Sequence, residues 1–201
     1  GISLPFTDQC APFFRKDSLL QEALGRVLEY GRAAGWSFVE WRDGGLPAYS
    51  TYFTHNLSLE ESEEALFFNL KPSNRRSIRK AVREGVTVSF DGSMGSLNAF
   101  YRLHYQTRKR HGLPPQPHRF FEKIHEHILM RRMGIIALAQ HAGHTVAASV
   151  LFMFDTQANY KYGASDLSYQ RFRPNNLLIW ETMKWLKKNG STCLNLGRTA
   201  P

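Results

Sequence analysis

The sequence is poor in cysteine and has no long apolar run. Only two cysteines, Cys10 and Cys193, occur among the 201 residues, so neither a disulfide framework nor a cysteine-based metal site is expected, and the reducing cytosol is the expected compartment. The longest nearly apolar runs, Gly134–Ala139 and Ala147–Phe154, are far shorter than the roughly 20 residues needed to cross a bilayer. We therefore expect a cytoplasmic protein without a transmembrane helix.

The signature loops of several enzyme classes are also absent. There is no Gly-x-Ser-x-Gly nucleophile elbow, Walker loop or paired-glycine dinucleotide fingerprint, which disfavours hydrolases and nucleotide triphosphatases. The histidines are not spaced as metal ligands. His125 and His127 lie on different faces of a predicted helix, and His141 and His144 have no acidic residue beside them in their turn. No metal site is predicted.

Acidic residues become scarce after residue 70. Residues 1–70 carry five basic and ten acidic side chains, net −5, whereas residues 71–201 carry 21 basic and seven acidic ones, net +14, which together give the formal charge of +9. Features that attract anions are therefore expected in the last two-thirds of the chain. Hydrophobic residues make up 42% of the sequence, as in globular proteins that form one large or two small packed domains.

Apolar periodicity and turn residues predict alternating helices and strands. In the first 70 residues we expect a helix at Asp17–Ala34, strands at Trp36–Trp41 and Ala48–Phe53 around a Gly44-Gly45 turn, and a helix with a Ser58-to-Glu61 capping box that Pro72 stops. After it we expect a helix between Ser73 and Gly85, a strand at Val86–Phe90, helices at Leu97–Arg110 and His118–Arg132, antiparallel strands at Ile135–Gln140, Val146–Phe154 and Asn159–Ala164, a helix at Asn175–Lys188 and a strand at Cys193–Leu196. The fold class is α/β (α+β), a mixed, mostly antiparallel sheet flanked by helices.

The first predicted helix after residue 70 is strongly basic. Its cations fall within an arc of roughly 140° at 100° per residue, opposite an apolar edge. The cations are Arg75, Arg76, Arg79, Lys80 and Arg83, and the apolar edge is Ile78, Ala81 and Val82. A solvated helix face is one interpretation. Mutual repulsion of these charges favours the other, in which a bound phosphate group relieves the repulsion.

The third strand of the predicted hairpins carries two tyrosines and a glycine. Tyr160 and Tyr162 share one face by the period of two, and Gly163 indicates a bulge or the close approach of another backbone. A bulge frees a backbone N–H that can hold a developing oxyanion. The alternative is that both tyrosines are interior residues beside an ordinary bulge.

The segment between this strand and the last helix is a candidate anion site. Pro174 preorganises the helix entry, Asn175 or Asn176 can cap the helix, and Arg171 and Arg173 lie at the positive end of its dipole. A second cationic group, Arg108-Lys109-Arg110, lies at a helix end, where offsetting the dipole is at least as good an explanation as ligand contact.

Four segments in this order resemble the FemAB-like branch of the GNAT acyltransferase superfamily, together with the related BioF2-like acetyltransferases. They are Arg75–Val86, Arg110-His111-Gly112, Tyr160–Ser165 and Arg173–Glu181, followed by Gly197-Arg198-Thr199. The resemblance implies a GNAT-like acyl-N-acyltransferase fold in tandem, with residues 1–70 as a partial first unit and 71–201 as the second. The family's Phe-Lys motif falls beyond Pro201, so we expect a C-terminally truncated fragment of a tandem protein.

The resemblance also has a departure at the donor loop. A GNAT acyl-CoA site usually resembles Arg/Gln-x-x-Gly-x-Gly/Ala, whose glycines let backbone N–H groups reach the pyrophosphate. Here Arg171–Asn176 has no glycine, and Pro174 has no N–H. FemAB-like proteins, which the resemblance implies use aminoacyl-tRNA, depart in the same direction.

Our hypothesis is N-acyl or aminoacyl transfer to an amine of a peptidoglycan or exopolysaccharide precursor, with no tightly bound cofactor and with aminoacyl-tRNA or acyl-CoA as donor. The expected partners are a nucleotide- or lipid-linked sugar or peptide precursor, tRNA and the membrane periphery. The expected catalytic residues are Tyr160, Tyr162 and Gly163, and the expected substrate-binding residues are Arg75, Arg79, Arg110, Ser165, Arg173, Asn175, Asn176 and Arg198. The alternatives are an acyl-CoA-dependent N-acetyltransferase acting on a sugar amine and a non-catalytic RNA-binding module.

Overall fold

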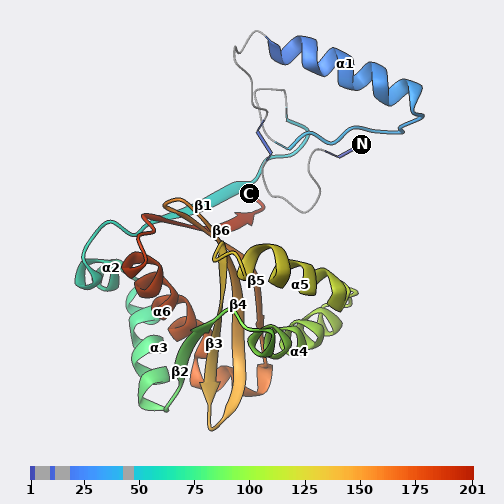
Figure 1. The fold of residues 1–201 in the computed structure, drawn as a ribbon. Helices are drawn as coiled ribbons and strands as arrows, with labels where there is room; N and C mark the ends of the chain where they lie inside the picture. The colour runs from blue at the N-terminus through green and yellow to red at the C-terminus, as the bar shows by residue number, and fades with distance from the viewer. Residues whose placement is uncertain (3–9, 12–18, 43–47) are drawn as a thin grey trace. The chain divides into compact units, whose positions relative to one another are not determined.

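The structure, a computed structural model, describes residues 1–2, 10–11, 19–42 and 48–201 (Figure 1). It divides into two compact units, Gly1–Phe53 with Arg198–Pro201, and Thr54–Gly197. The expected Asp17 cap and Gly44-Gly45 turn lie outside the described residues. No helix among those described is long and apolar enough to cross a membrane.

The smaller unit is built around helix α1, Leu19–Ala33, which confirms the predicted helix. Gly31 is buried against the Trp36 ring. A Cβ at this position would lie only 2.8 Å from the Trp36 Cε3 atom, so the ring leaves room for glycine alone. The strand expected at Trp36–Trp41 is wrong: it is reduced to one isolated bridge between Glu40 and Ile2. Alternation alone does not make a strand, since a ladder needs a paired neighbour along its length.

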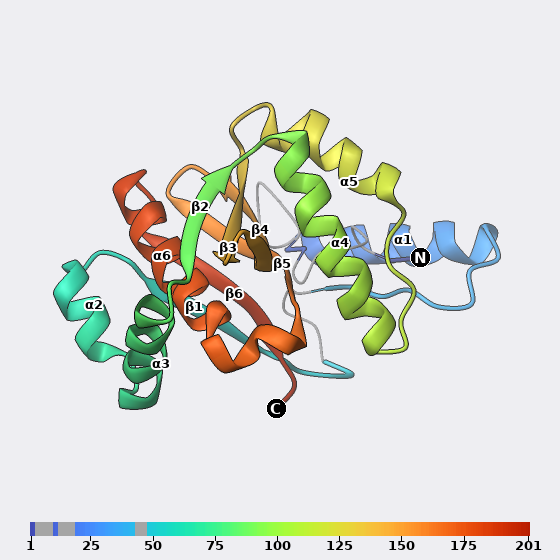
Figure 2. The same ribbon diagram turned by 90° about the horizontal axis from the view of Figure 1, so that it is seen from below.

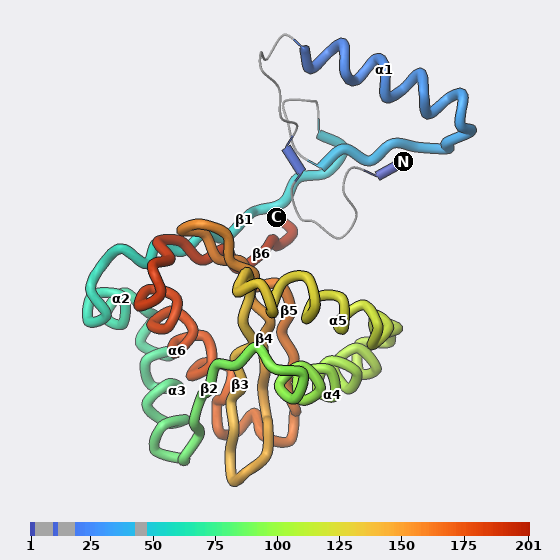
Figure 3. Tube along the Cα trace, in the orientation of Figure 1, coloured from blue at the N-terminus to red at the C-terminus, as the bar shows by residue number. Residues whose placement is uncertain are grey.

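The larger unit contains most of a six-stranded sheet in the order β1-β6-β5-β4-β3-β2. Strands β2 to β5 are antiparallel to their neighbours, and β5 and β6 are parallel. Figure 3 shows β3, β4 and β5 following one another along the chain, as expected for successive hairpins. The strands are β1 (Phe53–Ser58), β2 (Thr87–Asp91), β3 (Gly134–His141), β4 (His144–Phe154), β5 (Gln157–Ser165) and β6 (Cys193–Thr199).

Helices cover both faces of the sheet, with α2, α3 and α6 on one side and α4 and α5 on the other (Figures 1 and 2). Each group packs a separate core against the sheet, and this arrangement confirms the predicted mixed α/β class. The helices are α2 (Glu63–Asn69), α3 (Pro72–Arg83), α4 (Met94–Arg110), α5 (His118–Ile124), which continues as a π-helical turn (His125–Leu129), and α6 (Pro174–Lys188).

The expected boundaries of α2 and α3 are wrong. Ser58 does not cap a helix, because it ends β1 at the sheet edge; Ser62 is the N-cap of α2, and its hydroxyl accepts from the Ala65 N–H at 3.1 Å. Pro72 does not stop a helix but opens α3 at its first position, where its missing N–H costs nothing. The strand expected at Ala48–Phe53 begins only at Phe53.

Residues 54–70 belong to the core of the larger unit. Leu59 and Leu66 are 1% and 6% exposed and pack in the same cluster as α3 and α6. The compact units divide after residue 53, because burial of these two leucines ties β1 and α2 to the larger unit. The description of both units as GNAT-like repeats stays a prediction.

Candidate active site

Strand β5 has a backbone edge near Gly163 that β6 does not cover, and we call it the free edge. It pairs with β6 only through Gln157–Asn159, which lie opposite Cys193–Asn195. The described sheet registers no β6 residue opposite Gly163, so main-chain groups around this glycine can pair with another molecule. Parallel strands that separate in this way expose β5 next to the start of α6, which follows it in the chain.

A β-bulge lies in β5 beside this edge, at Lys161. Leu151 of β4 is opposite Tyr160, and the next β4 residue back, Val150, is opposite Tyr162. The extra residue reverses the alternation, so Tyr160 packs in the core under α3 and α6, and Tyr162 packs in the core under α4 and α5. The expectation that both tyrosines share a face is therefore wrong.

Gly163 is required by the close approach of a side chain. A Cβ at this position would clash with the Tyr160 hydroxyl and would lie 2.9 Å from the Tyr160 Cε1 and Cζ atoms. The sequence predicted the approach of another backbone at Gly163, whereas the group that approaches is the Tyr160 phenol and the bulge is two residues earlier. Only glycine leaves room for the Tyr160 ring to lie along its own strand.

Three residues predicted to bind substrate meet at the end of β5. Arg110 Nη1 at the end of α4 donates to the Ser165 carbonyl at 3.4 Å, and Asn175 Nδ2 in the first turn of α6 donates to the Ser165 hydroxyl at 3.3 Å. Thr107 completes this group, since its hydroxyl lies 3.4 Å from both the main-chain N and O atoms of Ser165. We call these four residues the Ser165 cluster.

The start of α6 differs from the expected cap. Arg173 is the N-cap, in the left-handed conformation with φ of 59°, and no side-chain hydrogen bond caps the helix. The asparagines do not cap it, because Asn175 binds Ser165 and Asn176 Nδ2 donates to the Asn74 side chain at 3.5 Å. A pocket of about 170 Å³ lies here, lined by Gln170, Arg173, Pro174, Asn175 and Asn176.

The other predicted substrate-binding arginines do not join the Ser165 cluster. Arg79 and Arg75 stack on rings of α2, with their Cζ atoms 5.5 Å from the Phe67 centroid and 4.9 Å from the Phe68 centroid. Arg198 belongs to the smaller unit, where its Cζ atom lies 4.3 Å from the Tyr52 ring centroid. Substrate binding by these residues stays a prediction.

Burial keeps both tyrosines of the site protonated at neutral pH. It raises the pKa of Tyr160 from 10.0 to about 12, and it also raises the pKa of Tyr162. The cause in both cases is desolvation, because burial disfavours the charged phenolate. Both hydroxyls can therefore donate a hydrogen bond but do not act as anionic bases.

The raised pKa of Tyr160 predicts a loss of stability in alkali. Between pH 10 and pH 12 the unfolded chain loses this proton before the folded chain does, so the free energy of unfolding falls with rising pH, by about 3 kcal/mol at most. Chemical denaturation as a function of pH measures the slope, and Tyr160→Phe should flatten it. Tyr105→Phe, at a half-exposed tyrosine, is the control and should leave the slope unchanged.

Thr107 and His104 lie near the site but belong to no motif that the sequence analysis could recognise. Thr107 lies among basic residues and is 58 positions from Ser165. His104 continues the apolar face of α4, is 5% exposed, and pairs through Nε2 with the Gln116 Oε1 atom at 2.7 Å. Burial lowers the pKa of His104, so the ring is neutral at pH 7.

A family model describes this part of the chain. The model for the acetyltransferase (GNAT) domain matches residues 71–201, which include every element that forms the site. The chain belongs to the GNAT acetyltransferase family. The activity that this family carries out is acyl transfer, and the resemblance to GNAT enzymes seen in the sequence is confirmed.

Three solved structures share the fold of this chain. A crystal structure of FemX superposes with a TM-score of 0.72 at 15% identity, covering 98% of this chain and 74% of that one. The C-terminal domain of a protein described as a lysylphosphatidylglycerol synthetase from Agrobacterium fabrum gives a TM-score of 0.65 at 14% identity, with 92% and 61% covered. L-PGS from Bacillus licheniformis gives 0.62 at 14%, with 92% and 60% covered. At these identities the likeness shows a shared fold. A comparison with curated proteins gives no match.

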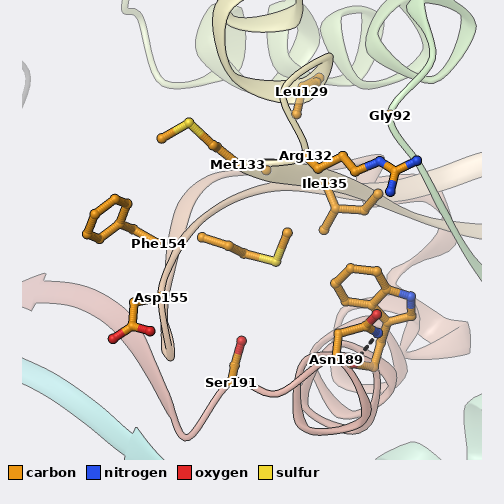
Figure 4. A pocket seen from close by; sticks show the side chains of 12 residues that line it. Gly92, Leu129, Arg132, Met133, Ile135, Phe154, Asp155, Asn189 and Ser191 are labelled. Atoms are coloured by element: carbon orange, nitrogen blue, oxygen red, sulfur yellow. Dashed lines mark hydrogen bonds between the residues drawn. The ribbon is translucent and has the colours of Figure 1, made fainter.

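The GNAT domain has a second, larger pocket away from the Ser165 cluster. It has a volume of about 610 Å³ and lies between the start of β3, the end of β4 and the end of α6. Figure 4 shows the side chains of Arg132 and Asp155 on opposite sides of it. No predicted site residue lines this pocket. Among the described residues no group of three histidines, cysteines or acids is placed to hold a metal ion.

Proposed function

We propose that this chain transfers an acyl or aminoacyl group from an activated ester to an amine of a cell-envelope precursor, a reaction of the cytoplasm when the donor is aminoacyl-tRNA. The observation that carries the proposal is the edge of β5 near Gly163, which β6 does not cover and which lies between the Ser165 cluster and the start of α6. Membership of the GNAT family supplies the reaction type. The fold shared with FemX and with a protein named for lysyl transfer to phosphatidylglycerol favours an aminoacyl donor and an envelope acceptor.

The free edge provides the donors that acyl transfer needs. The amine nitrogen forms a bond to the donor carbonyl carbon, the bond to the leaving oxygen breaks, and the proton lost by the amine passes to that oxygen. A backbone N–H of β5 near Gly163 would hold the carbonyl oxygen as it becomes negative. Tyr162, protonated and half-buried, would donate to the leaving oxygen. Tyr160 shapes the strand beside Gly163.

The start of α6 favours a donor with one phosphate group over a pyrophosphate. The first helical N–H groups are free to bind an anion, but Pro174 supplies none, and the residue before it is the left-handed Arg173 in place of a glycine. The Arg173 guanidinium can add a charged donor to the pocket of about 170 Å³. A tRNA 3′ end presents single phosphates, whereas acyl-CoA presents a pyrophosphate.

Ligand-induced stabilisation and transfer assays test the proposal together. At a donor concentration of 100 times Kd we expect about 2.7 kcal/mol of stabilisation by aminoacyl-tRNA, transfer to an amine acceptor, and loss of transfer in Tyr162→Phe. Tyr105→Phe is the matched control. Stabilisation by acetyl-CoA and not by tRNA would instead support an N-acetyltransferase acting on a sugar amine. The description of the family as an acetyltransferase domain favours this alternative. Salt-sensitive tRNA binding without transfer, unaffected by Tyr162→Phe, would indicate an RNA-binding module.

Arg173 is expected to lower the free energy of unfolding and to increase the affinity for the donor. A non-glycine residue in the left-handed conformation costs about 1 kcal/mol, so Arg173→Gly should raise the free energy of unfolding by about that amount. The same change removes the guanidinium and should weaken donor binding about tenfold. Denaturant unfolding and titration with the donor measure the two effects.

Ala142→Gly is the matched control for Arg173→Gly. Ala142 has a φ of 48° in the turn between β3 and β4, so its replacement should stabilise the protein to a similar extent without changing donor affinity. Unchanged donor affinity in Arg173→Gly would remove Arg173 from the site.

A further inference from the structure

The five cations of α3 remain without an assignment in the site described above. They are Arg75, Arg76, Arg79, Lys80 and Arg83, and we call them the α3 cationic face. None of them forms an ion pair with a carboxylate in the part of the chain that the structure describes, whereas Lys123 and Lys184 do. Like charges along one helix repel each other, so an opposing negative surface would stabilise this face.

The helix that carries these cations is firmly held on its other side. Ile78 and Ala81 are 5% and 0% exposed in the core that α3 shares with α6. The α3 cationic face is therefore a preformed surface that needs no folding step to bind.

Exposed apolar side chains lie among the cations. Phe68 at the end of α2 is 74% exposed, with the Arg75 guanidinium carbon 4.9 Å from its ring centroid. Val82 of α3 is 59% exposed, although its spacing predicted a place on the apolar edge. A cationic surface with an aromatic and an aliphatic group in it matches the boundary of a bilayer, where phosphates lie beside acyl chains. A nucleic-acid backbone would leave the valine without a partner.

We propose that the α3 cationic face, with Phe68 and Val82, docks on an anionic phospholipid bilayer. The charge of the lipid headgroups opposes the five cations, and the two apolar side chains enter the acyl boundary. Asn74, near the start of α3, pairs with Asn176 of α6, so a docked bilayer would lie beside the candidate active site. In combination with the proposed function, this favours a lipid-linked acceptor.

Binding to vesicles tests this surface without any transfer reaction. The 201-residue chain is sedimented with vesicles of phosphatidylcholine alone and with vesicles containing phosphatidylglycerol. We expect binding only to the latter, decreasing with salt. Each cation near the surface contributes about 1 kcal/mol, so Arg76→Gln with Arg83→Gln should weaken binding roughly 25-fold. Phe68→Ser, which leaves the charge unchanged, should weaken it about fivefold.

Arg102→Gln with Arg119→Gln is the control for charge, because both side chains are exposed on helices of the other face of the sheet. It should bind like the parent, and circular dichroism should show all variants folded. Equal binding to neutral vesicles, or unchanged binding in the α3 variants, would overturn the proposal. So would tRNA binding that is lost with the arginines and unaffected by Phe68→Ser. Because no transfer is measured, this result is independent of the proposed function.

Discussion

Replacing Gly163 by alanine is expected to lower the rate of acyl transfer by about 100-fold, the loss that follows a displacement of about 1 Å in a reacting geometry. The new Cβ would lie where the Tyr160 phenol now packs, 2.9 Å from its Cε1 and Cζ atoms. Either the ring leaves its buried position or the end of β5 moves away from it. Both changes shift the free edge that the proposed reaction uses, and a transfer assay with saturating donor measures the effect.

The effect of Gly163→Ala should depend on Tyr160. In the double variant with Tyr160→Ala the clash is absent, so the double variant should recover a free energy of unfolding close to that of Tyr160→Ala alone. Gly95→Ala is the control, because a Cβ there meets only Ser93 Oγ at an ordinary 3.6 Å. A full rate in Gly163→Ala would show that the strand edge has no part in the reaction.

Truncation of Phe121 to alanine should lower the free energy of unfolding by about 3–5 kcal/mol. The ring is 0% exposed and lies at the centre of the core between α4, α5 and the sheet. Its centroid is 5.4 Å from that of Phe100, 5.1 Å from that of His104 and 5.3 Å from that of Tyr162. Its removal leaves a cavity that these rings cannot fill without leaving their places.

Urea denaturation measures this loss, and Phe154→Ala is its control. Phe154 is 76% exposed at the end of β4, so its truncation should change the free energy of unfolding by no more than about 0.5 kcal/mol. Since Tyr162 packs on Phe121, the variant should also reduce transfer at temperatures where it remains folded. A small stability loss would mean that the aromatic core rearranges to close the cavity.

The elements that the sequence predicted well have strong local signals. The three hairpin strands agree with β3, β4 and β5 to within two residues at each end, because glycine and polar turns separate apolar runs there. The helix at Asn175–Lys188 differs from α6 by one residue, since proline precedes it and glycine follows it. Each of these signals acts between residues that are close in the chain.

The wrong predictions depend on contacts between distant residues. Tyr160 and Tyr162 lie on opposite faces because β4 holds β5 with one extra residue at Lys161, and that register is set by packing between two strands. Ser62 and not Ser58 caps α2 because the Leu59 N–H pairs with the Thr192 carbonyl and draws Ser58 into the sheet edge. Neither the β4–β5 register nor the Leu59–Thr192 hydrogen bond can be recognised from the sequence of one segment alone.

The candidate site was predicted in part for the same reason. Three of the motif residues, Arg110, Ser165 and Asn175, meet in one cluster, and their part in substrate binding stays a prediction. Thr107 was missed, because a threonine in a basic helix gains its importance only from a strand 58 residues away. Arg75 and Arg79 belong to the same motif set but stack on α2 rings outside the cluster.

The sequence by itself determined the composition of this protein's parts: a basic second portion, a run of hairpins followed by a helix, and a GNAT-like order of motifs. The first two follow from the count of charges, local periodicity and turn chemistry, and the third is a resemblance to a known family. Tertiary structure decided which side of the sheet each tyrosine occupies, that β6 leaves the edge of β5 near Gly163 uncovered, and which side chains gather at Ser165. Those outcomes depend on strand register and on packing between segments far apart in the chain, where burial and close contact select one arrangement among several that the sequence allows.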